Sequence, residues 1–572
     1  MRLSISKSKN ATSYYVKADV TIDGKRTTKI LQKLGTHAEL EKKLGGRDPE
    51  EWAREYVEKL NREEREGREP VVIAKYSPSK LIPKGEHRKF NGGYLFLQKL
   101  YHSIGLDKIC NEISKKHKFE YNLDSILSRL LYGRILFPSS KLSTYELSAQ
   151  LIEQPNFELH QIYRALEVIS KETDFIQSTL YKNSLNFSKR TTGILYYDCT
   201  NYFFEIEKEE GLKQYGYSKE HKPNPIVQMG LFMDGDGIPL AFNISPGNTN
   251  EQVTLKPLEK KILSDFELSK FIVCTDAGLA SNSNRKFNNR AGRAFITTQS
   301  IKKLKGFLRE WALEPKGWSL DGSTESYDLC DIDEEKYRNK IFYKERWIKE
   351  NDLEQKLIVT YSIKYRDYHR EVRNSQIQRA MDTLDKNPSK ISKHRQNDYK
   401  RFINKKSCTH DGEIAEKEIY NLNTELIKGE SIFDGFYAVC TNLQEDAAEI
   451  TKINRRRWEI EECFRIMKYE FKARPVYLKR DDRISAHFTT CFMALLIYRL
   501  LEKKLGGEFT CETIIKSLRN MAFLESKGYG YIPAYTRTDF TDALHKSFGF
   551  RTDYEIVSLK QMKNIFKDTK SK

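Results

Sequence analysis

The chain has 572 residues, 39% of them hydrophobic, which is enough for two to four domains with apolar cores and excludes a wholly disordered protein. With 98 Lys and Arg against 80 Asp and Glu, the formal net charge is +18, and a polyanion is the usual partner for such a surplus. The longest apolar run, 491–498, is far shorter than the roughly 20 residues that span a bilayer, and the first residues begin no apolar signal segment. We therefore expect a cytoplasmic protein without a membrane partner.

The first 90 residues predict a β-hairpin and a helix. Two strand-like runs, 14–22 and 25–34, flank Asp23-Gly24, a dipeptide that fits a two-residue hairpin turn. A charged helix should follow over 48–66, because Asp48 and Pro49 are typical of a helix start.

Residues 91–190 predict a compact helical region. Apolar residues recur at three- and four-residue spacing in 123–136 and 142–152, and Phe137-Pro138-Ser139-Ser140 separates the two runs. Two interpretations stay open with equal weight: a region that grips a DNA backbone, and a plain packing domain.

The segments 191–300 and 431–505 predict one mixed α/β sheet. Strands are expected over 194–205, 226–233 and 238–244, then a helix over 252–263, a strand over 271–275, a helix over 282–290 and a strand over 294–298. The pattern resumes with a strand over 433–441, a long helix over 446–471 and a helix over 487–501. The remainder, 506–572, should be helical with a basic tail.

Residues 301–430 interrupt this rhythm and predict an inserted β-rich domain. Its run 386–406 has eight Lys or Arg and one acid, which is typical of a solvated helix face and also of a surface that follows phosphates. Trp311, Trp318 and Trp347 also lie here; such residues either pack in a core or stack on a base.

Two aspartates stand where apolar strands should end or be buried. Asp198 lies inside the strand 194–205, and Asp276 directly follows the strand 271–275. An unpaired buried carboxylate is costly, so each needs a metal, a cation or strong hydrogen bonds. Either aspartate alone is also typical of a turn or a cap, but ligands gather at strand ends in open α/β sheets.

The helix 446–471 provides a third carboxylate. At 100° per residue, Ile453, Phe464, Met467 and Phe471 fall within roughly 40° of Ile460 and define the core stripe. A polar stripe borders it, whereas Glu459 and Glu462 are expected on the outward face. The polar stripe contains Arg457, Glu461 and Lys468, with Asn454 and Arg465 a little beyond. It can equally be a salt-bridge ladder on a surface helix.

Asp198, Asp276 and Glu461 can converge on one pocket. Clustered carboxylates repel each other unless cations neutralise them, and oxygen ligands suit Mg²⁺ or Mn²⁺. Two such ions can promote an in-line phosphodiester displacement, and Arg457 and Lys468 would then contact phosphates.

At these residues the sequence resembles the DDE transposases of insertion sequences. One branch of that family has the helix motif Y-x-x-R-x-x-x-E-x-x-x-x-x-x-K, and Arg457, Glu461 and Lys468 keep its spacing, with Asn454 in place of the tyrosine. The resemblance covers roughly 193–501, and its further segments are Tyr197-Asp198-Cys199-Thr200, Gly216-Tyr217-Ser218-Lys219, Gly237-Ile238-Pro239-Leu240, Gly247-Asn248-Thr249-Asn250-Glu251, Thr275-Asp276-Ala277-Gly278 and Asp434-Gly435-Phe436.

The resemblance implies a fold and an activity. The fold would be an RNase H-like mixed sheet flanked by helices and interrupted by the β-rich insertion. The enzyme would cut double-stranded DNA at element ends and join the 3′-hydroxyls to target DNA, as a homodimer on paired ends, with two Mg²⁺ or Mn²⁺ ions held by Asp198, Asp276 and Glu461. It would associate with the nucleoid when bound to DNA and needs no evident protein cofactor.

The resemblance also suggests the DNA contacts, which would be Arg457, Lys468, Asn454, Arg465 and Lys219. Two alternatives remain: an RNase H-like nuclease that cuts without joining, and a DNA-binding protein that has lost catalysis.

Overall fold

The computed structural model describes residues 1–8, 11–22, 25–67, 77–386, 398–407 and 418–571. The chain forms two compact units, Met1–Pro83 and Lys84–Lys572.

The first unit is a three-stranded antiparallel sheet with two helices. Strands β1 (Arg2–Lys7), β2 (Thr12–Ile22) and β3 (Lys25–Thr36) pair in that order, and helices α1 (His37–Leu44) and α2 (Pro49–Gly67) follow. The predicted hairpin and helix are therefore confirmed, while the turn residues Asp23 and Gly24 lie outside the described residues. Thr36 begins α1 with a reciprocal capping box to Glu39, and Tyr14, Leu40 and Ala53 form the small core.

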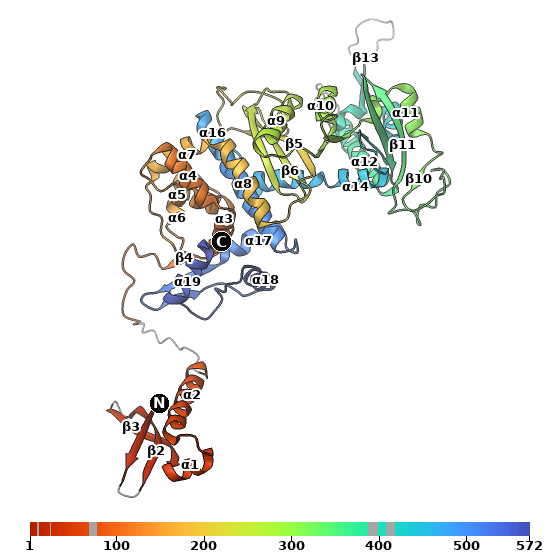
Figure 1. Ribbon diagram of the computed structural model, residues 1–572. Helices are drawn as coiled ribbons and strands as arrows, with labels where there is room; N and C mark the ends of the chain where they lie inside the picture. The colour runs from red at the N-terminus through yellow and green to blue at the C-terminus, as the bar shows by residue number, and fades with distance from the viewer. Residues whose placement is uncertain (9–10, 23–24, 68–76, 387–397, 408–417, 572) are drawn as a thin grey trace. The chain divides into compact units, whose positions relative to one another are not determined.

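The second unit begins with the predicted helical region. It contains β4 (Lys89–Asn91), α3 (Tyr94–Ser103), α4 (Leu106–His117), α5 (Leu123–Leu136), α6 (Lys141–Ser148), α7 (Leu159–Lys171) and α8 (Thr173–Phe187). Helices α3, α5, α7 and α8 pack against α16 (Asp481–Lys504), which lies beside them in Figure 1. Among the described residues, α16 is the one helix long and apolar enough to cross a membrane, but 94% of its most apolar window is buried inside the protein, as in a core helix.

A nine-stranded mixed sheet forms the centre of this unit. Its order is β10-β11-β12-β15-β9-β8-β5-β6-β7. The pairs β5-β8 and β8-β9 are parallel, and the other neighbouring pairs are antiparallel. The bounds of the strands are β5 (Ile194–Phe203), β6 (Ile226–Asp234), β7 (Pro239–Pro246), β8 (Ile272–Thr275), β9 (Ala294–Thr298), β10 (Ser319–Leu320), β11 (Phe342–Glu350), β12 (Leu353–Tyr361) and β15 (Phe436–Thr441).

Helices flank this sheet, so the predicted mixed α/β fold is confirmed. They include α9 (Leu255–Asp265), α10 (Asn282–Phe287), α14 (Ala447–Arg455) and α15 (Trp458–Arg465). Apolar clusters pack against both faces of β5: Tyr196 belongs to the large cluster shared with α15 and α16, and Tyr197 to the cluster shared with α9.

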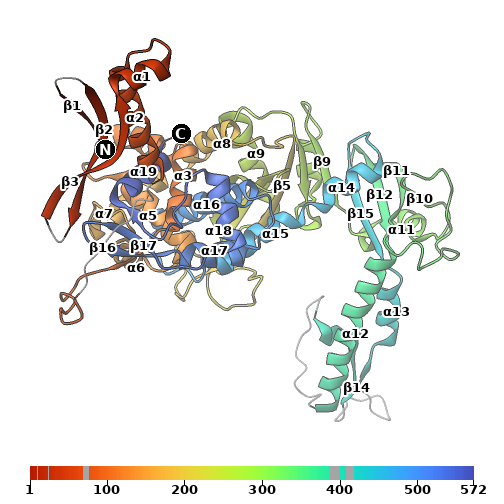
Figure 2. The ribbon, with the colours of Figure 1, turned by 90° about the horizontal axis from the view of Figure 1, so that it is seen from below.

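The inserted segment extends this sheet. Strands β11 and β12 join it through β15, which also pairs with β9. The segment also contains α11 (Gly306–Leu313), α12 (Ile363–Lys386), α13 (Thr424–Ser431) and the hairpin of β13 (Ile403–Ser407) and β14 (Glu418–Leu422). Figure 2 shows α12 and α13 running side by side away from β12 and β15. Most of the basic run 386–406 lies outside the described residues, since 387–397 are not described.

Residues 506–572 contain strands as well as helices, where only helices were expected. Their elements are α17 (Cys511–Asn520), β16 (Ala522–Ser526), β17 (Gly530–Pro533), α18 (Asp539–Phe548), β18 (Val557–Ser558) and α19 (Leu559–Lys570). The sheet β18-β17-β16-β4 joins them to residues near the start of the unit. Such a pairing between distant segments leaves no local pattern in the sequence.

Candidate active site

The two aspartates predicted from the sequence lie on neighbouring parallel strands. Asp198 is half-buried inside β5, and Asp276 follows the last residue of β8. Asp198 accepts a hydrogen bond from the Cys199 amide at 2.7 Å. Asp276 caps the short 3₁₀ turn Ala277–Leu279 by accepting from the Leu279 amide at 3.0 Å. Each carboxylate therefore keeps an oxygen that these bonds do not use.

The two carboxylates affect each other electrostatically. The pKa of Asp198 is raised to about 6, chiefly by burial and also by the charge of Asp276, while Lys219 and Arg457 act in the opposite direction. A pair of half-buried carboxylates with this mutual repulsion attracts a cation. Their oxygen donors are of the type that Mg²⁺ and Mn²⁺ prefer.

Two lysines lie beside Asp198. The Lys219 ammonium group donates to the Cys199 carbonyl and lies 3.1 Å from Glu251 Oε1. Burial alone would lower the pKa of Lys219, but the charges of Asp198 and Glu251 raise it. Burial lowers the pKa of Lys468 to about 8, and Lys219 adds to this effect. The sequence analysis singled out both lysines, and the structure brings them together at the acid pair.

The predicted helix 446–471 is divided in the structure. Helix α14 ends at Arg455, α15 begins at Trp458, and a π-helical turn, Ile466–Glu470, follows. Between α14 and α15 the Arg456 and Arg457 amides bond to carbonyls only three residues earlier, at 3.1 and 3.2 Å. Because a turn with three residues advances about 120° per residue in place of 100°, one helical wheel cannot describe both helices.

Glu461 lies on the solvent-facing side of α15, and its side chain is 62% exposed. Its nearest charged partner is Arg457, whose Nη1 is 3.7 Å from Glu461 Oε1. Both residues line a cavity of about 270 Å³ together with Tyr365, Tyr437 and Trp458. Arg457 also lowers the pKa of Asp198, so it interacts with both Glu461 and the acid pair.

The expectation that Glu459 and Glu462 face outward is wrong. Glu459 is 13% exposed and pairs with Arg456 at 2.9 Å and Arg499 at 3.4 Å, and Glu462 pairs with Arg465 at 2.6 Å. The fully buried Cys463 widens the apolar stripe of α15 toward Glu459, which turns Glu461 outward. Glu461 is still the glutamate of the three with the loosest contacts.

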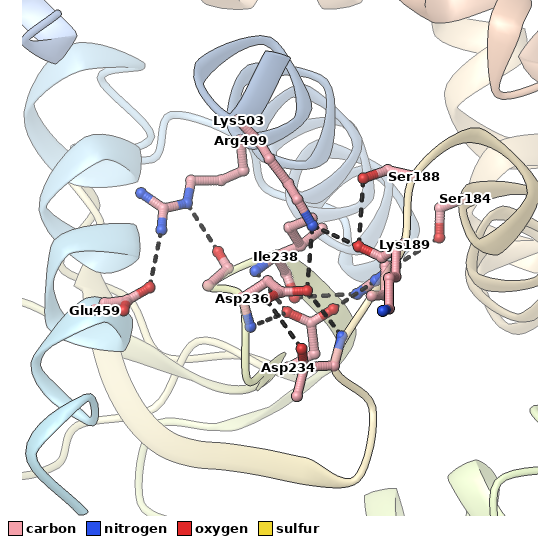
Figure 3. Close-up of polar contacts among 12 residues, drawn as sticks. Ser184, Ser188, Lys189, Asp234, Asp236, Ile238, Glu459, Arg499 and Lys503 are labelled. Atoms are coloured by element: carbon pink, nitrogen blue, oxygen red, sulfur yellow. Dashed lines mark hydrogen bonds and ion pairs between the residues drawn. The ribbon is translucent and has the colours of Figure 1, made fainter. Parts of the chain in front are cut away.

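A polar network fixes α15 against the turn between β6 and β7. Arg499 of α16 donates to the Gly237 carbonyl at 2.8 Å and pairs with Glu459, as Figure 3 shows. In the same turn, Lys503 pairs with Asp236 at 3.1 Å, and the buried Asp234 pairs with Arg190. The helix that carries Glu461 is thus held to the strand that pairs with β5.

The two remaining predicted DNA contacts are engaged with protein groups. Asn454 is buried and donates to the Tyr437 hydroxyl at 3.0 Å, while its own Oδ1 has no partner. Arg465 pairs with Glu462 and lies 3.7 Å from Glu470. Sequence reasoning assigned no role to Glu251, the partner of Lys219, although it belongs to the segment Gly247-Asn248-Thr249-Asn250-Glu251.

The structure brings together Asp198, Asp276, Lys219, Lys468 and Arg457, with Glu461 further out. Across the residues that the structure describes, no group of three or more Asp, Glu, His or Cys side chains is arranged to hold a metal ion. Glu461 would therefore have to approach Asp198 and Asp276 to share a metal ion with them.

Comparisons with known proteins identify the family of the region that carries the candidate site. The model of the family described as "Transposase DDE domain" matches residues 202–497, more than half of the chain, a span that includes Asp276 and Glu461. No curated protein matched the chain. Among solved structures, the chain is similar to the "piggyBac transposase synaptic complex with hairpin DNA" from cryo-EM, with 8% identity, 83% of this chain and 85% of that chain covered, and a TM-score of 0.37.

Proposed function

Because the chain belongs to the transposase DDE-domain family, we propose that it cuts DNA at the ends of an insertion sequence and joins the 3′-hydroxyls to target DNA. One observation carries the proposal: Asp198 and Asp276 lie on neighbouring parallel strands, with Lys219, Lys468 and Arg457 close to Asp198. Acidic residues that attract metal beside cations that attract phosphate suit a phosphodiester substrate.

Asp198, Asp276 and Glu461 are the residues that would hold the metal. Mg²⁺ or Mn²⁺, with two ions in the site, would supply Lewis-acid stabilisation of the attacking and leaving oxygens when bound. Asp198 and Asp276 fit this role because they offer free carboxylate oxygens and repel each other without a cation. Glu461 would complete the set by moving from Arg457 toward the pair, which its exposed side chain permits.

The basic side chains position the DNA. Lys219 and Lys468 would bind the phosphate at the acid pair, and Arg457 would bind a phosphate oxygen once Glu461 turns to the metal. Arg465 would contact DNA at the edge of the site, where it now pairs with Glu462. Asn454 would act through its hydrogen bond to the Tyr437 hydroxyl. We further propose that the enzyme works as a homodimer on two paired double-stranded ends and acts in the cytoplasm, on the nucleoid.

The test is cleavage of DNA that carries the element's own ends, with Mg²⁺ or Mn²⁺, by the wild type and Glu461→Gln. Glu462→Gln is the matched control, since it removes a carboxylate one residue away that pairs with Arg465. We expect Glu461→Gln to bind the ends and lose cleavage by about 10³-fold or more, because it loses a metal ligand. Glu462→Gln should cleave nearly as well as the wild type.

The same assay separates the alternatives. Adding a target plasmid and ends with a free 3′-hydroxyl detects joining, and cleavage without any joined product would indicate a nuclease. Binding without cleavage by the wild type would indicate a DNA-binding protein without catalysis. Equal cleavage by Glu461→Gln and the wild type would remove Glu461 from the triad and contradict the proposed mechanism.

A further inference from the structure

A second cavity, of about 480 Å³, lies between α6 and the segment 472–478. None of its described lining residues is an aspartate or a glutamate. Five of them are basic: Arg134, Lys141, Lys472, Arg474 and His487. Ser139 and Ser140 also line the cavity, at the start of α6, where the first amide groups of a helix lack acceptors within the helix. Apolar side chains, among them Leu142, Pro475 and Val476, also line the cavity, but its described charged residues are all basic and favour an anion.

Two of these basic residues are buried without a carboxylate partner. Arg134 is 6% exposed; its Nη1 donates to the Phe471 carbonyl at 2.9 Å, and its Nε has no partner within the described part of the chain. Lys141 is 8% exposed, and its ammonium group makes no hydrogen bond or ion pair with any residue that the structure describes. Burying such charges is unfavourable unless a counter-charge accompanies them.

The pKa shifts of these groups are those of cations buried without a counter-charge. Burial, with a smaller effect of Arg134, lowers the pKa of Lys141 to about 7. Burial and the charges of Arg134 and Lys141 hold the pKa of His487 well below its usual value. Among the described groups that shift these two pKa values, the one acidic group is the buried Cys491 thiol, which raises the pKa of Lys141. An anion in the cavity would favour the charged form of Lys141.

The cavity is connected to the strand that carries Asp198. The Val476 amide donates to the Phe203 carbonyl at 3.0 Å, so the segment that lines the cavity continues the sheet at the end of β5. Phe203 lies five residues beyond Asp198, which at a rise of about 3.3 Å per residue is roughly 17 Å. That length corresponds to about five base pairs along a DNA duplex.

An ion-pair chain makes a second connection to the acid pair. Arg474, in the cavity wall, pairs with Glu220, and Glu220 Oε1 also lies 3.4 Å from the Lys468 ammonium group. Lys468 in turn is close enough to Asp198 for the two charges to interact. An ion-pair chain therefore runs from the cavity wall to the lysine beside Asp198.

We propose that this cavity binds a backbone phosphate of the DNA, a few nucleotides from the phosphodiester at Asp198 and Asp276, with Lys141, Arg134 and Arg474 as its ligands. The inference rests on the proposed function, since it takes DNA to be the substrate. It adds a phosphate contact outside the predicted helix motif, in the helical region for which a plain packing role was an equal alternative.

The test compares Lys141→Met with Lys182→Met. Lys182 is an exposed lysine on α8 that pairs with Glu267, so its replacement removes the same charge elsewhere on the unit. Affinity is measured by fluorescence anisotropy with a labelled duplex of arbitrary sequence and about 30 base pairs, between about 50 and 200 mM salt. Melting temperatures are measured with and without inorganic phosphate, which also shows that each variant is folded.

We expect opposite effects of Lys141→Met on stability and on binding. The melting temperature should rise, because a buried charge without a partner is replaced by an apolar side chain. Affinity for the duplex should fall about tenfold, and the slope of log affinity against log salt should decrease by about one. Lys182→Met should change neither property comparably. If Lys141→Met does not fold, Lys141→Gln takes its place.

The other outcomes overturn the proposal in distinguishable ways. If Lys141→Met binds the duplex as tightly as the wild type with the same salt slope, the lysine is only structural, even when the wild type still cleaves element ends. If phosphate stabilises the wild type and not Lys141→Met while duplex binding is unchanged, the cavity holds a small anion and not DNA. If the wild type neither binds nor cleaves DNA, the proposed function itself fails.

Discussion

Asp198 and Asp276 occupy equivalent positions in the register of two parallel strands. The pairs of β5 and β8 run from Ile194 with Ile272 to Tyr196 with Cys274, so the residue numbers differ by 78, as they do for the two aspartates. Neighbouring strands lie about 4.8 Å apart, which places the two carboxylates side by side at the C-terminal end of β8. The parallel register therefore creates the acid pair.

We predict that Asp276→Asn abolishes metal-dependent cleavage, by about 10³-fold or more, without unfolding the protein. The wild type should gain melting temperature on addition of Mg²⁺, because a ligand that binds only the folded state stabilises it, and Asp276→Asn should lose most of this gain. Asp265→Asn, which removes an exposed carboxylate at the end of α9, is the control. An equal Mg²⁺ response in Asp276→Asn and the wild type would contradict a metal site at this pair.

A second prediction concerns the buried Glu259 of α9. Its Oε1 accepts from Asn288 at 2.7 Å, its Oε2 has no partner among the residues that the structure describes, and burial raises its pKa to about 7. A carboxyl whose pKa is higher in the folded than in the unfolded state makes its full contribution to the free energy of unfolding below the unfolded-state pKa. That contribution is lost as the pH rises through the folded-state pKa of about 7. We expect Glu259→Gln to be more stable than the wild type at about pH 8, by up to about 3 kcal/mol, and nearly equal at about pH 5. Urea unfolding at both pH values measures this, and a difference independent of pH would refute it.

The strands of the central sheet were predicted well from the sequence because each one is a short, continuous run of apolar residues. The expected strand 294–298 is β9 itself, and 194–205 contains β5. Sequence periodicity could not show which segments pair at a distance, and so it missed that β15 joins the inserted strands to β9 and that β16 pairs with β4.

The candidate site was predicted in part for a similar reason. Asp198 and Asp276 were predicted because each is a carboxylate inside or directly after an apolar strand. The helical wheel misplaced Glu459, because the contribution of Cys463 to the core and the partner Arg499 on α16 depend on tertiary packing. Lys141 was assigned no role from the sequence, because its burial without a hydrogen-bond or ion-pair partner among the described residues is seen only in the structure.

A third prediction concerns the buried ion pair of Arg190 and Asp234. Their side chains are fully buried, with Arg190 Nε 2.5 Å from Asp234 Oδ2, and Arg190 also donates to Ser184 at 2.6 Å. Removing one partner leaves an uncompensated buried charge, so Arg190→Met should cost about 3–5 kcal/mol of unfolding free energy. Adding Asp234→Asn should cost less than the sum of the two single changes. Denaturant unfolding of all four proteins measures the coupling, and strictly additive costs would show that the pair is not coupled.

Two of the three tryptophans of the insertion, Trp318 and Trp347, should differ in role, one in the core and one on the surface. Trp318 is fully buried, donates from Nε1 to the Glu314 carbonyl at 2.9 Å and packs against Phe436. Trp318→Ala should therefore destabilise the protein by about 3–5 kcal/mol. Trp347 on β11 is 39% exposed, with the Lys356 ammonium group 5.8 Å from its ring.

If Trp347 stacks on an unpaired base, Trp347→Ala should leave stability within about 1 kcal/mol of the wild type and weaken binding of single-stranded DNA by about tenfold. Trp347→Phe is the matched variant, because it keeps an aromatic face and should retain most of the affinity. Chemical denaturation and anisotropy with a labelled single strand give the two readouts. Unchanged affinity in Trp347→Ala would assign this side chain to the surface of β11 alone, whereas a loss restored by phenylalanine would place a single strand over the insertion.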